Sequence, residues 1–345
     1  MTRRFSWALG ACLVLVLAAN HAQARVGHKE RPRDVEVGLL GVDPPLARPP
    51  LAPLDARARS LLASVEADPA PESIIRNSHY WISNEHHHAV WQPFISGIGG
   101  VLLGVGTDQN YLLAGWSKAR VMMLVDFDGK IPLLHKIYGL FFKHSATPER
   151  FKLRWSEPYN SESMALIRSG LAPDDPKLAR TLLKIFQVTR PLIWHRLGRV
   201  SRQHRKLGIA TFLDNQGQYD HIRGLWQQER VVAVRGDLTG EITMRHIARA
   251  LRLTGLEMGV LYLSNAEQYF KYGPNFRRNI LEIPWSHRGI ALRTLAWGCH
   301  GLISSKDMYH YNRQAGRNFA AWMAHSLISS AGRMLNKKTN SGVKG

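Results

Sequence analysis

The sequence predicts an α/β protein built on a doubly wound, mainly parallel sheet with a helical insertion. Five short apolar segments alternate with helix-like segments, which is the rhythm of a parallel sheet with crossover helices. The apolar segments are continuously hydrophobic, as strands covered on both faces are. The chain has 345 residues, of which 45% are hydrophobic, enough to bury a substantial core.

The N-terminus has the three parts of a secretory signal peptide. Arg3 and Arg4 precede an apolar run over residues 7–19, and Ala22-Gln23-Ala24 is a small-x-small cleavage site. We therefore expect residues 1–24 to be removed near Ala24 and the protein to be exported, to the periplasm or out of the cell. A retained membrane anchor is the alternative, but the apolar run is short for a membrane span.

Cleavage after Ala24 would remove one of the two cysteines. Cys12 lies in the leader, so Cys299 is left alone. A single cysteine forms neither an internal disulfide nor a cysteine metal cluster.

Residues 25–71 hold 8 of the 17 prolines and predict an extended tether, with a short helical piece over 55–65. The main domain is expected over 72–330. Residues 331–345 are expected to form a disordered basic tail.

The main domain is expected to begin with a helix over 72–95. A helical insertion is expected over 146–208, and a further short strand over 210–213. The five main strands are expected at 101–105, 121–125, 231–234, 259–263 and 290–295. The helices between them are expected at 109–118, 131–144, 241–254 and 275–281.

Polar residues follow four of the expected strands. The carboxyl ends of parallel strands share one edge, and ligands bind there at the point where the strand order reverses. An acid about 20 residues beyond a glycine pair is suited to accept hydrogen bonds from ribose hydroxyls. We therefore expect a small polar ligand at this edge. The residues concerned are Gly104 and Gly106 after the first strand, Asp126 and Asp128 after the second, Asp237 after the third and Asn265 after the fourth.

These motifs resemble those of class I S-adenosylmethionine-dependent methyltransferases, which have a Rossmann-like fold. The likeness covers the runs 100–128, 231–237 and 261–270. It is closer to a group of uncharacterised bacterial proteins with that fold, which share three short runs. In this chain these runs are Ser83-Asn84-Glu85, the stretch from Gly104 to Asn110, and the stretch from Tyr262 to Tyr269.

The resemblance implies S-adenosylmethionine as the cofactor. Gly104 and Gly106 would face its methionine part, Asp126 or Asp128 its ribose, and Asp237 its adenine. Glu267 or Tyr269 would then act on the methyl acceptor. The chain departs from the family where Leu102 replaces an acid that binds the cofactor's amino-acid end.

Asp108 stands where the family often has a third glycine, and two interpretations remain open. Its carboxylate would lie near the cofactor ammonium, or it would cap the following helix. Export adds a further difficulty, because this cofactor is made in the cytoplasm. The sequence thus leaves open whether the domain is an enzyme.

The net charge is +20, from 46 Lys and Arg residues against 26 Asp and Glu residues. Such a field attracts polyanions, and export favours anions of the cell envelope over nucleic acid. Arg196, Arg199, Arg202 and Lys206 are expected to share one helix face. This face is either simply solvated or docks on anionic lipid or polymer, so the second hypothesis is a non-enzymatic envelope protein.

Glu85-His86-His87-His88 suggests a metal site. Adjacent residues on a helix point about 100° apart, so at most two of these imidazoles would share one ion, and no second ligand cluster accompanies them. We expect a polar helix face and no metal, with Glu85 bordering the strand-end pocket. Hydrolase and NTP-driven functions lack their motifs, since the chain has neither Gly-x-Ser-x-Gly nor a phosphate-binding loop.

Overall fold

The computed structural model describes residues 53–296, 303–304 and 309–335. All of them belong to the second of the two units into which the chain divides, Leu51–Gly345. The predicted signal peptide, most of the predicted tether, both cysteines and residues 336–345 lie outside the described residues.

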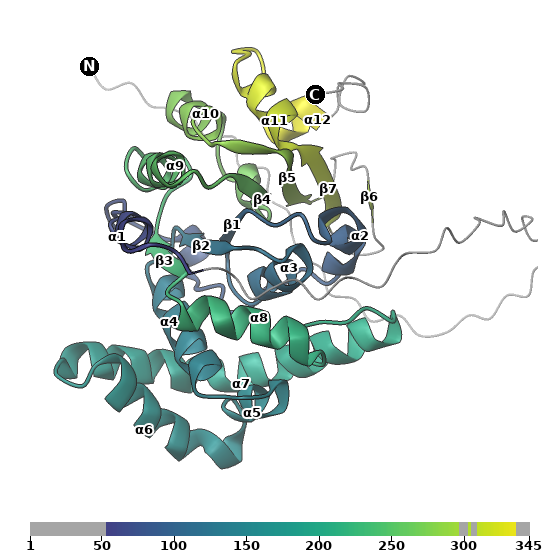
Figure 1. Ribbon diagram of the computed structural model, residues 1–345. Helices are drawn as coiled ribbons and strands as arrows, with labels where there is room; N and C mark the ends of the chain where they lie inside the picture. Colours follow the sequence, from purple (N-terminus) through teal and green to yellow (C-terminus); the bar gives the residue numbers. More distant parts are fainter. Residues whose placement is uncertain (1–52, 297–302, 305–308, 336–345) are drawn as a thin grey trace, which may run out of the picture. The chain divides into compact units, whose positions relative to one another are not determined.

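A seven-stranded, mainly parallel sheet forms the centre of this unit (Figure 1). Its order is β3-β2-β1-β4-β5-β7-β6, and only the neighbours of β7 pair with it in antiparallel fashion. The five predicted strands are confirmed and the fold is α/β. The strands are β1 (Val101–Val105), β2 (Val121–Asp126), β3 (Val231–Arg235), β4 (Met258–Tyr262), β5 (Trp285–Leu295), β6 (Ile303–Ser304) and β7 (His310–Ala315).

Each face of the sheet is covered by helices, so the central strands β1, β2 and β4 are buried on both sides. Successive residues of β1 point to different cores: Leu102 belongs to one and Leu103 to the other. The first core is shared with α2 (Gln92–Ile95), α3 (Gln109–Ser117), α4 (Lys130–Lys143) and the helices of the insertion. The second is shared with α1 (Ala56–Ala63), α9 (Thr243–Thr254), α10 (Pro274–Leu281), α11 (Gly316–Met323) and α12 (Ala331–Leu335).

The predicted helical insertion lies between α4 and β3 and is confirmed. It continues past residue 208, because a helix that the sequence analysis missed follows it. Its helices are α5 (Pro148–Leu153), α6 (Asn160–Leu171), α7 (Pro176–Lys206) and α8 (Gln216–Gln227). Single turns of 3₁₀ helix lie at Ile75–Asn77, His88–Trp91, Glu157–Tyr159 and Ala266–Gln268.

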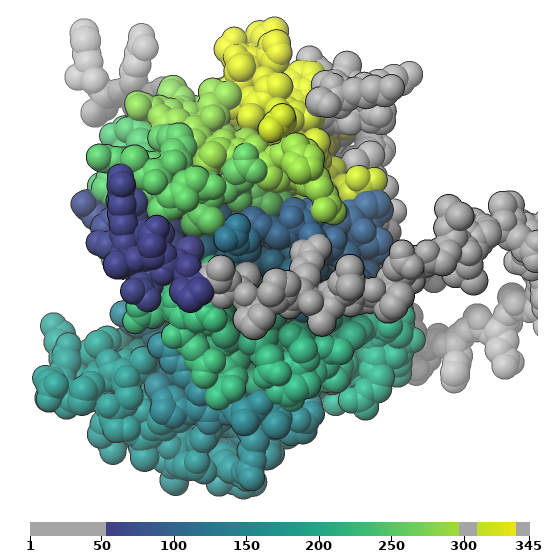
Figure 2. Space-filling model, viewed as in Figure 1, coloured from purple at the N-terminus to yellow at the C-terminus, as the bar shows by residue number. Residues whose placement is uncertain are grey.

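The part of the predicted tether that the structure describes is folded onto the domain. α1 begins after Asp55, whose carboxylate accepts a hydrogen bond from the Ala58 amide and so caps the helix, as expected for the short helical piece. Leu62 is fully buried against α9. Figure 2 shows this segment in purple against the green surface of the domain.

Three expectations about local structure are wrong. Residues 72–95 are mostly irregular, because their polar groups bind strand ends instead of forming a helix. Residues 210–213 form a turn, because Asp214 accepts hydrogen bonds from the amide and hydroxyl of Thr211 and closes it. The tail is not disordered over 331–335, where α12 buries Ala331 and Met334.

Within the described part of the chain, none of the helices combines the length and hydrophobicity needed to span a membrane.

Candidate functional site

The strand order reverses between β1 and β4, which places the switch point of the sheet there. The chain winds outward from β1 through β2 to β3, and from β4 to β5 on the other side. Gly106, Asp126, Asp237 and Asn265 each stand at or just after the carboxyl end of a strand. The structure therefore brings the predicted residues to one edge of the sheet.

Two glycines, Gly104 within the end of β1 and Gly106 just after it, make room for the chain's own side chains. A Cβ atom at Gly104 would collide with the side-chain oxygen of Asn110, and one at Gly106 with the side-chain nitrogen of Gln109. Both amides donate hydrogen bonds to the carbonyl of Val105, at 3.1 Å each. Gly106 also has a φ of +82°, which favours glycine. The space beside the glycines is thus filled from within the fold.

Asp126 at the end of β2 lies against this loop, as its spacing predicted. One carboxylate oxygen accepts a hydrogen bond from the Gly106 amide at 3.0 Å, and the other from the Asp128 amide at 2.9 Å. Burial, together with the nearby charge of Asp128, raises the pKa of Asp126 to about 7. A partly exposed carboxyl that titrates near neutrality at a strand end is the kind of group found at functional sites.

Asp128 is bound by His79 and by the first residue of α4, Lys130. Its carboxylate accepts hydrogen bonds from Nδ1 of His79 at 2.6 Å and from the Lys130 amide at 3.0 Å. Nζ of Lys130 lies 2.9 Å from Nε2 of His79. His79 therefore links the end of β2 to the exposed start of α4.

Asp108 does not cap α3, and its carboxylate is buried and bound within the fold. Its carboxylate accepts hydrogen bonds from the Ser83 amide at 3.0 Å and from Nε of Arg196 at 2.8 Å, and it makes no capping bond to α3. Burial alone would raise the pKa of Asp108, but Arg196 and the Ser83 amide outweigh it and hold the pKa below its usual value.

The predicted basic face is therefore wrong for Arg196, whose side chain is 1% exposed. A three-residue step advances 300° around a helix, so the direction drifts by 60° at each step. Arg196 and Arg202 consequently point in directions 120° apart. Of the four predicted residues, Arg199, Arg202 and Lys206 are exposed.

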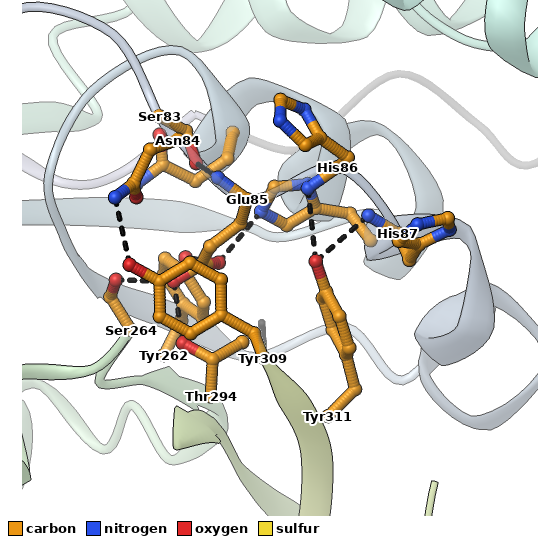
Figure 3. Close-up of polar contacts among 12 residues, drawn as sticks. Ser83, Asn84, Glu85, His86, His87, Tyr262, Ser264, Thr294, Tyr309 and Tyr311 are labelled. Carbon is orange, nitrogen blue, oxygen red and sulfur yellow. Dashed lines mark hydrogen bonds and ion pairs between the residues drawn. The ribbon is translucent and has the colours of Figure 1, made fainter. Parts of the chain in front are cut away.

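Residues 79–88 cross the carboxyl ends of the strands from one side of the switch point to the other; we call them the 79–88 segment. His79 binds Asp128 after β2, and Ser83 binds Asp108 after β1. The amides of His86 and His87 both donate to the hydroxyl of Tyr311 on β7, at 2.9 Å each (Figure 3). The run Glu85–His88 was predicted as a polar helix face, and it instead belongs to a crossing that is irregular up to His87.

Glu85 is fully buried and anchors the centre of this segment in a polar cluster (Figure 3). Its carboxylate accepts hydrogen bonds from the hydroxyls of Tyr262, of Ser264 at 2.6 Å and of Thr294 at 2.6 Å. Nε2 of His88 lies 3.0 Å away. Burial alone would raise the pKa of Glu85, but His88 and the hydroxyls of Ser264 and Thr294 hold it below the usual value. The prediction that Glu85 borders the strand ends is confirmed.

A partly exposed rim surrounds the cluster. The side-chain amide of Asn84 donates to the hydroxyl of Tyr309 at 2.7 Å, and that of Asn265 lies 3.5 Å from the same oxygen. Tyr80 and Tyr269, 45% and 48% exposed, are close enough to act electrostatically on Tyr309. This rim offers amides and aromatic faces to a ligand.

Two further predicted residues, Glu267 and Asp237, have partners inside the fold. Glu267 is buried, paired with Arg293 on β5 and hydrogen-bonded by Tyr272. Asp237 accepts from the amide and hydroxyl of Thr239, 2.7 Å each. Asp68 closes the same turn by accepting from the Asp237 amide at 2.9 Å.

Sequence reasoning missed three residues that complete the cluster. They are Thr294 on β5, Tyr309 just before β7 and Tyr311 on β7. Thr294 and Tyr311 are register partners, so the antiparallel strand itself brings them together. The sequence did contain one indication of this cluster. Two of the short runs shared with the similar bacterial proteins meet here, because Glu85 of the first run binds Tyr262 and Ser264 of the last.

Histidines of the Glu85–His88 run take part in this cluster. No group of three or more His, Cys, Asp or Glu side chains in the described residues is arranged to hold a metal ion.

Comparison with protein families assigns most of this architecture to one group. The family model named Domain of unknown function (DUF7790) matches residues 80–345. The chain belongs to the DUF7790 family. All seven strands and nearly all of the 79–88 segment lie in the DUF7790 region, whereas α1 and Asp68 precede it. A search of curated proteins found no match to the chain.

Proposed function

We propose that this DUF7790 domain binds a small nucleoside-like ligand across the carboxyl ends of β2, β1 and β4. The observation that carries the proposal is the convergence of polar residues from separate strand ends along the 79–88 segment. Asp126 lies at one side of the switch point, and the rim of Tyr80, Asn84, Asn265 and Tyr269 at the other.

The topology supports this location. The order of the first five strands, 3-2-1-4-5, is that of doubly wound sheets that bind ligands at the switch point. The ends of β2 and β4 are two strand spacings apart, about 10 Å. A nucleoside spans such a distance, with its ribose at Asp126 and its base at the tyrosines of the rim.

The chemistry of these residues supports the class of ligand. A carboxylate has about four acceptor sites, so Asp126 can accept ribose hydroxyls beside the two amides it already binds. Exposed tyrosine rings offer apolar faces for a base, and the Asn84 and Asn265 amides offer donors and acceptors for its edge.

The residues fit a nucleoside better than the whole of S-adenosylmethionine. Leu102 is buried where the methyltransferase family places an acid, and Asn110 and Gln109 fill the space beside the glycines where the methionine part would lie. We therefore derive no methyl-transfer step, and the methyltransferase-like character that we propose is one of fold.

Thermal unfolding in the presence of millimolar adenosine, S-adenosylmethionine or S-adenosylhomocysteine tests the proposal. We expect each to raise the melting temperature by a few degrees at concentrations about 100 times its Kd, and adenosine to do as well as the larger compounds. Asp126→Asn should weaken binding at least fivefold, because a charged acceptor is replaced by a neutral one. Asp174→Asn, an exposed site in the insertion, is the matched control.

Absence of protection by all three compounds would contradict the proposal, as would unchanged binding by both Asp126→Asn and Asn265→Ala. Much stronger protection by S-adenosylmethionine than by adenosine would show that the methionine part has its own site, against the fit described above.

A further inference from the structure

One side of α7 carries an unbroken line of exposed residues, which we call the α7 stripe. Successive members are three or four residues apart, the spacing that keeps side chains on one side of a helix. All are exposed to solvent. The stripe consists of Lys184, Val188, Leu192, His195, Arg199, Arg202 and Lys206.

The helix that carries the stripe is entirely without acids. Its 31 residues include nine lysines and arginines and no aspartate or glutamate. Arg196 and Arg190 are paired with Asp108 and Glu157. By contrast, no carboxylate among the described residues lies within ion-pair distance of the four stripe cations. The stripe therefore presents uncompensated positive charge.

Apolar side chains lie between these cations. Val188 is 50% exposed and Leu192 is 41% exposed, and Trp194 beside them is 39% exposed. An anionic polymer or a nucleic acid would neutralise the cations but would leave these side chains in water. A lipid surface accommodates both, with cations at the phosphates and apolar side chains below them.

A cavity opens beside the stripe between α7 and α5. Its volume is about 460 Å³, and its lining includes the stripe residues His195 and Arg202 together with Trp194, Lys152 and Glu149. Glu149 is 65% exposed and lies 3.9 Å from Nζ of Lys152. Lys152 is 22% exposed and also donates a hydrogen bond to the Leu213 carbonyl at 3.1 Å. The cavity thus combines cations with an aromatic wall and suits a phosphate-bearing headgroup.

We propose that the α7 stripe docks the protein on an anionic phospholipid surface, with α7 in the plane of the surface and a headgroup in the α5–α7 cavity. The stripe shares no residue with the strand-end site.

Flotation of the purified full chain with vesicles tests this proposal. Vesicles of phosphatidylcholine with about one third phosphatidylglycerol should bind the protein, and pure phosphatidylcholine should not. Binding should weaken as the salt concentration rises, because exposed charges are screened. Each basic residue near an anionic surface contributes about fivefold to partition, so Arg199→Glu with Arg202→Glu should reduce binding by about 25-fold or more.

Arg57→Glu with Arg59→Glu is the matched control, because it makes the same charge change at exposed positions on α1, which covers the other face of the sheet. It should reduce binding no more than about fivefold. Val188→Ser with Leu192→Ser should weaken binding to vesicles and leave binding to dextran sulfate unchanged. Thermal unfolding of every variant verifies that it is folded.

Equal loss of vesicle binding in the two arginine pairs would overturn the proposal, and so would failure to bind phosphatidylglycerol vesicles at low salt. If the Val188→Ser, Leu192→Ser double variant binds vesicles as well as the unmodified protein does, the proposal is also overturned. The stripe would then be a site for an anionic polymer. Asp126→Asn should leave vesicle binding intact, which separates this proposal from that of the strand-end site.

Discussion

At the scale of single residues, Asp126 has a charge that its surroundings disfavour. Its carboxylate accepts hydrogen bonds from two backbone amides, but burial and the charge of Asp128 still raise its pKa to about 7. An aspartate in the unfolded chain titrates near 3.8. Between these two pH values the folded protein binds the proton more tightly, so this residue makes the free energy of unfolding fall as the pH rises toward 7.

Asp126→Asn should remove this dependence. Relative to the unmodified protein, the variant should gain stability progressively between about pH 4 and pH 7 and level off above, reaching about 1–2 kcal/mol because partial exposure reduces the full effect of the pKa shift. Urea unfolding at four pH values measures it, with Asp174→Asn as the control for loss of one negative charge. A difference in stability that stays constant with pH would contradict this assignment.

At the scale of elements, the 79–88 segment depends on contacts that lie far away in the sequence. Glu85→Gln should release it, because a neutral amide cannot serve four partners as the carboxylate does and leaves buried hydroxyls poorly paired. We expect a loss of about 2–4 kcal/mol in the free energy of unfolding. Hydrogen exchange at the His86 and His87 amides should become faster. Ser78→Ala, at an exposed neighbour, should change neither quantity.

The elements that the sequence predicted well are those with a local signal. The strands of the parallel sheet are continuous apolar runs, and their helices follow at regular intervals, so β1 to β5 and α3, α4, α9 and α10 were found. β7 was missed, because His310–Ala315 is mostly polar and is a strand only through its pairing with β5. Tyr311 was missed for the same reason, because it reaches the site only through this pairing. The partner of Asp108 was also missed, because Arg196 lies 88 residues away in the sequence.

At the scale of the whole molecule, the folded unit is larger than the DUF7790 region. Leu62 fills the core against α9, and Asp68 accepts hydrogen bonds from the amides of Asp237 and Ile242. A chain that begins at Tyr80 lacks both. It should therefore unfold at a clearly lower urea concentration than a chain that begins at residue 53. Leu62→Ala in the longer chain should account for about 2–5 kcal/mol of the difference. Equal midpoints for the two chains would show that α1 does not stabilise the domain.

The contacts of the 79–88 segment also set the order in which the molecule is assembled. Glu85 and Thr294 are 209 residues apart, and His86 and Tyr311 are 225 apart. During synthesis the Glu85–His87 part of this segment lacks its partners on β5 and β7 until nearly the last part of the chain has emerged. Closing so long a loop is slow, so this crossing is among the last contacts to form. The Glu85–His87 part of the crossing consequently stays undocked in any nascent or truncated chain that lacks β5 and β7.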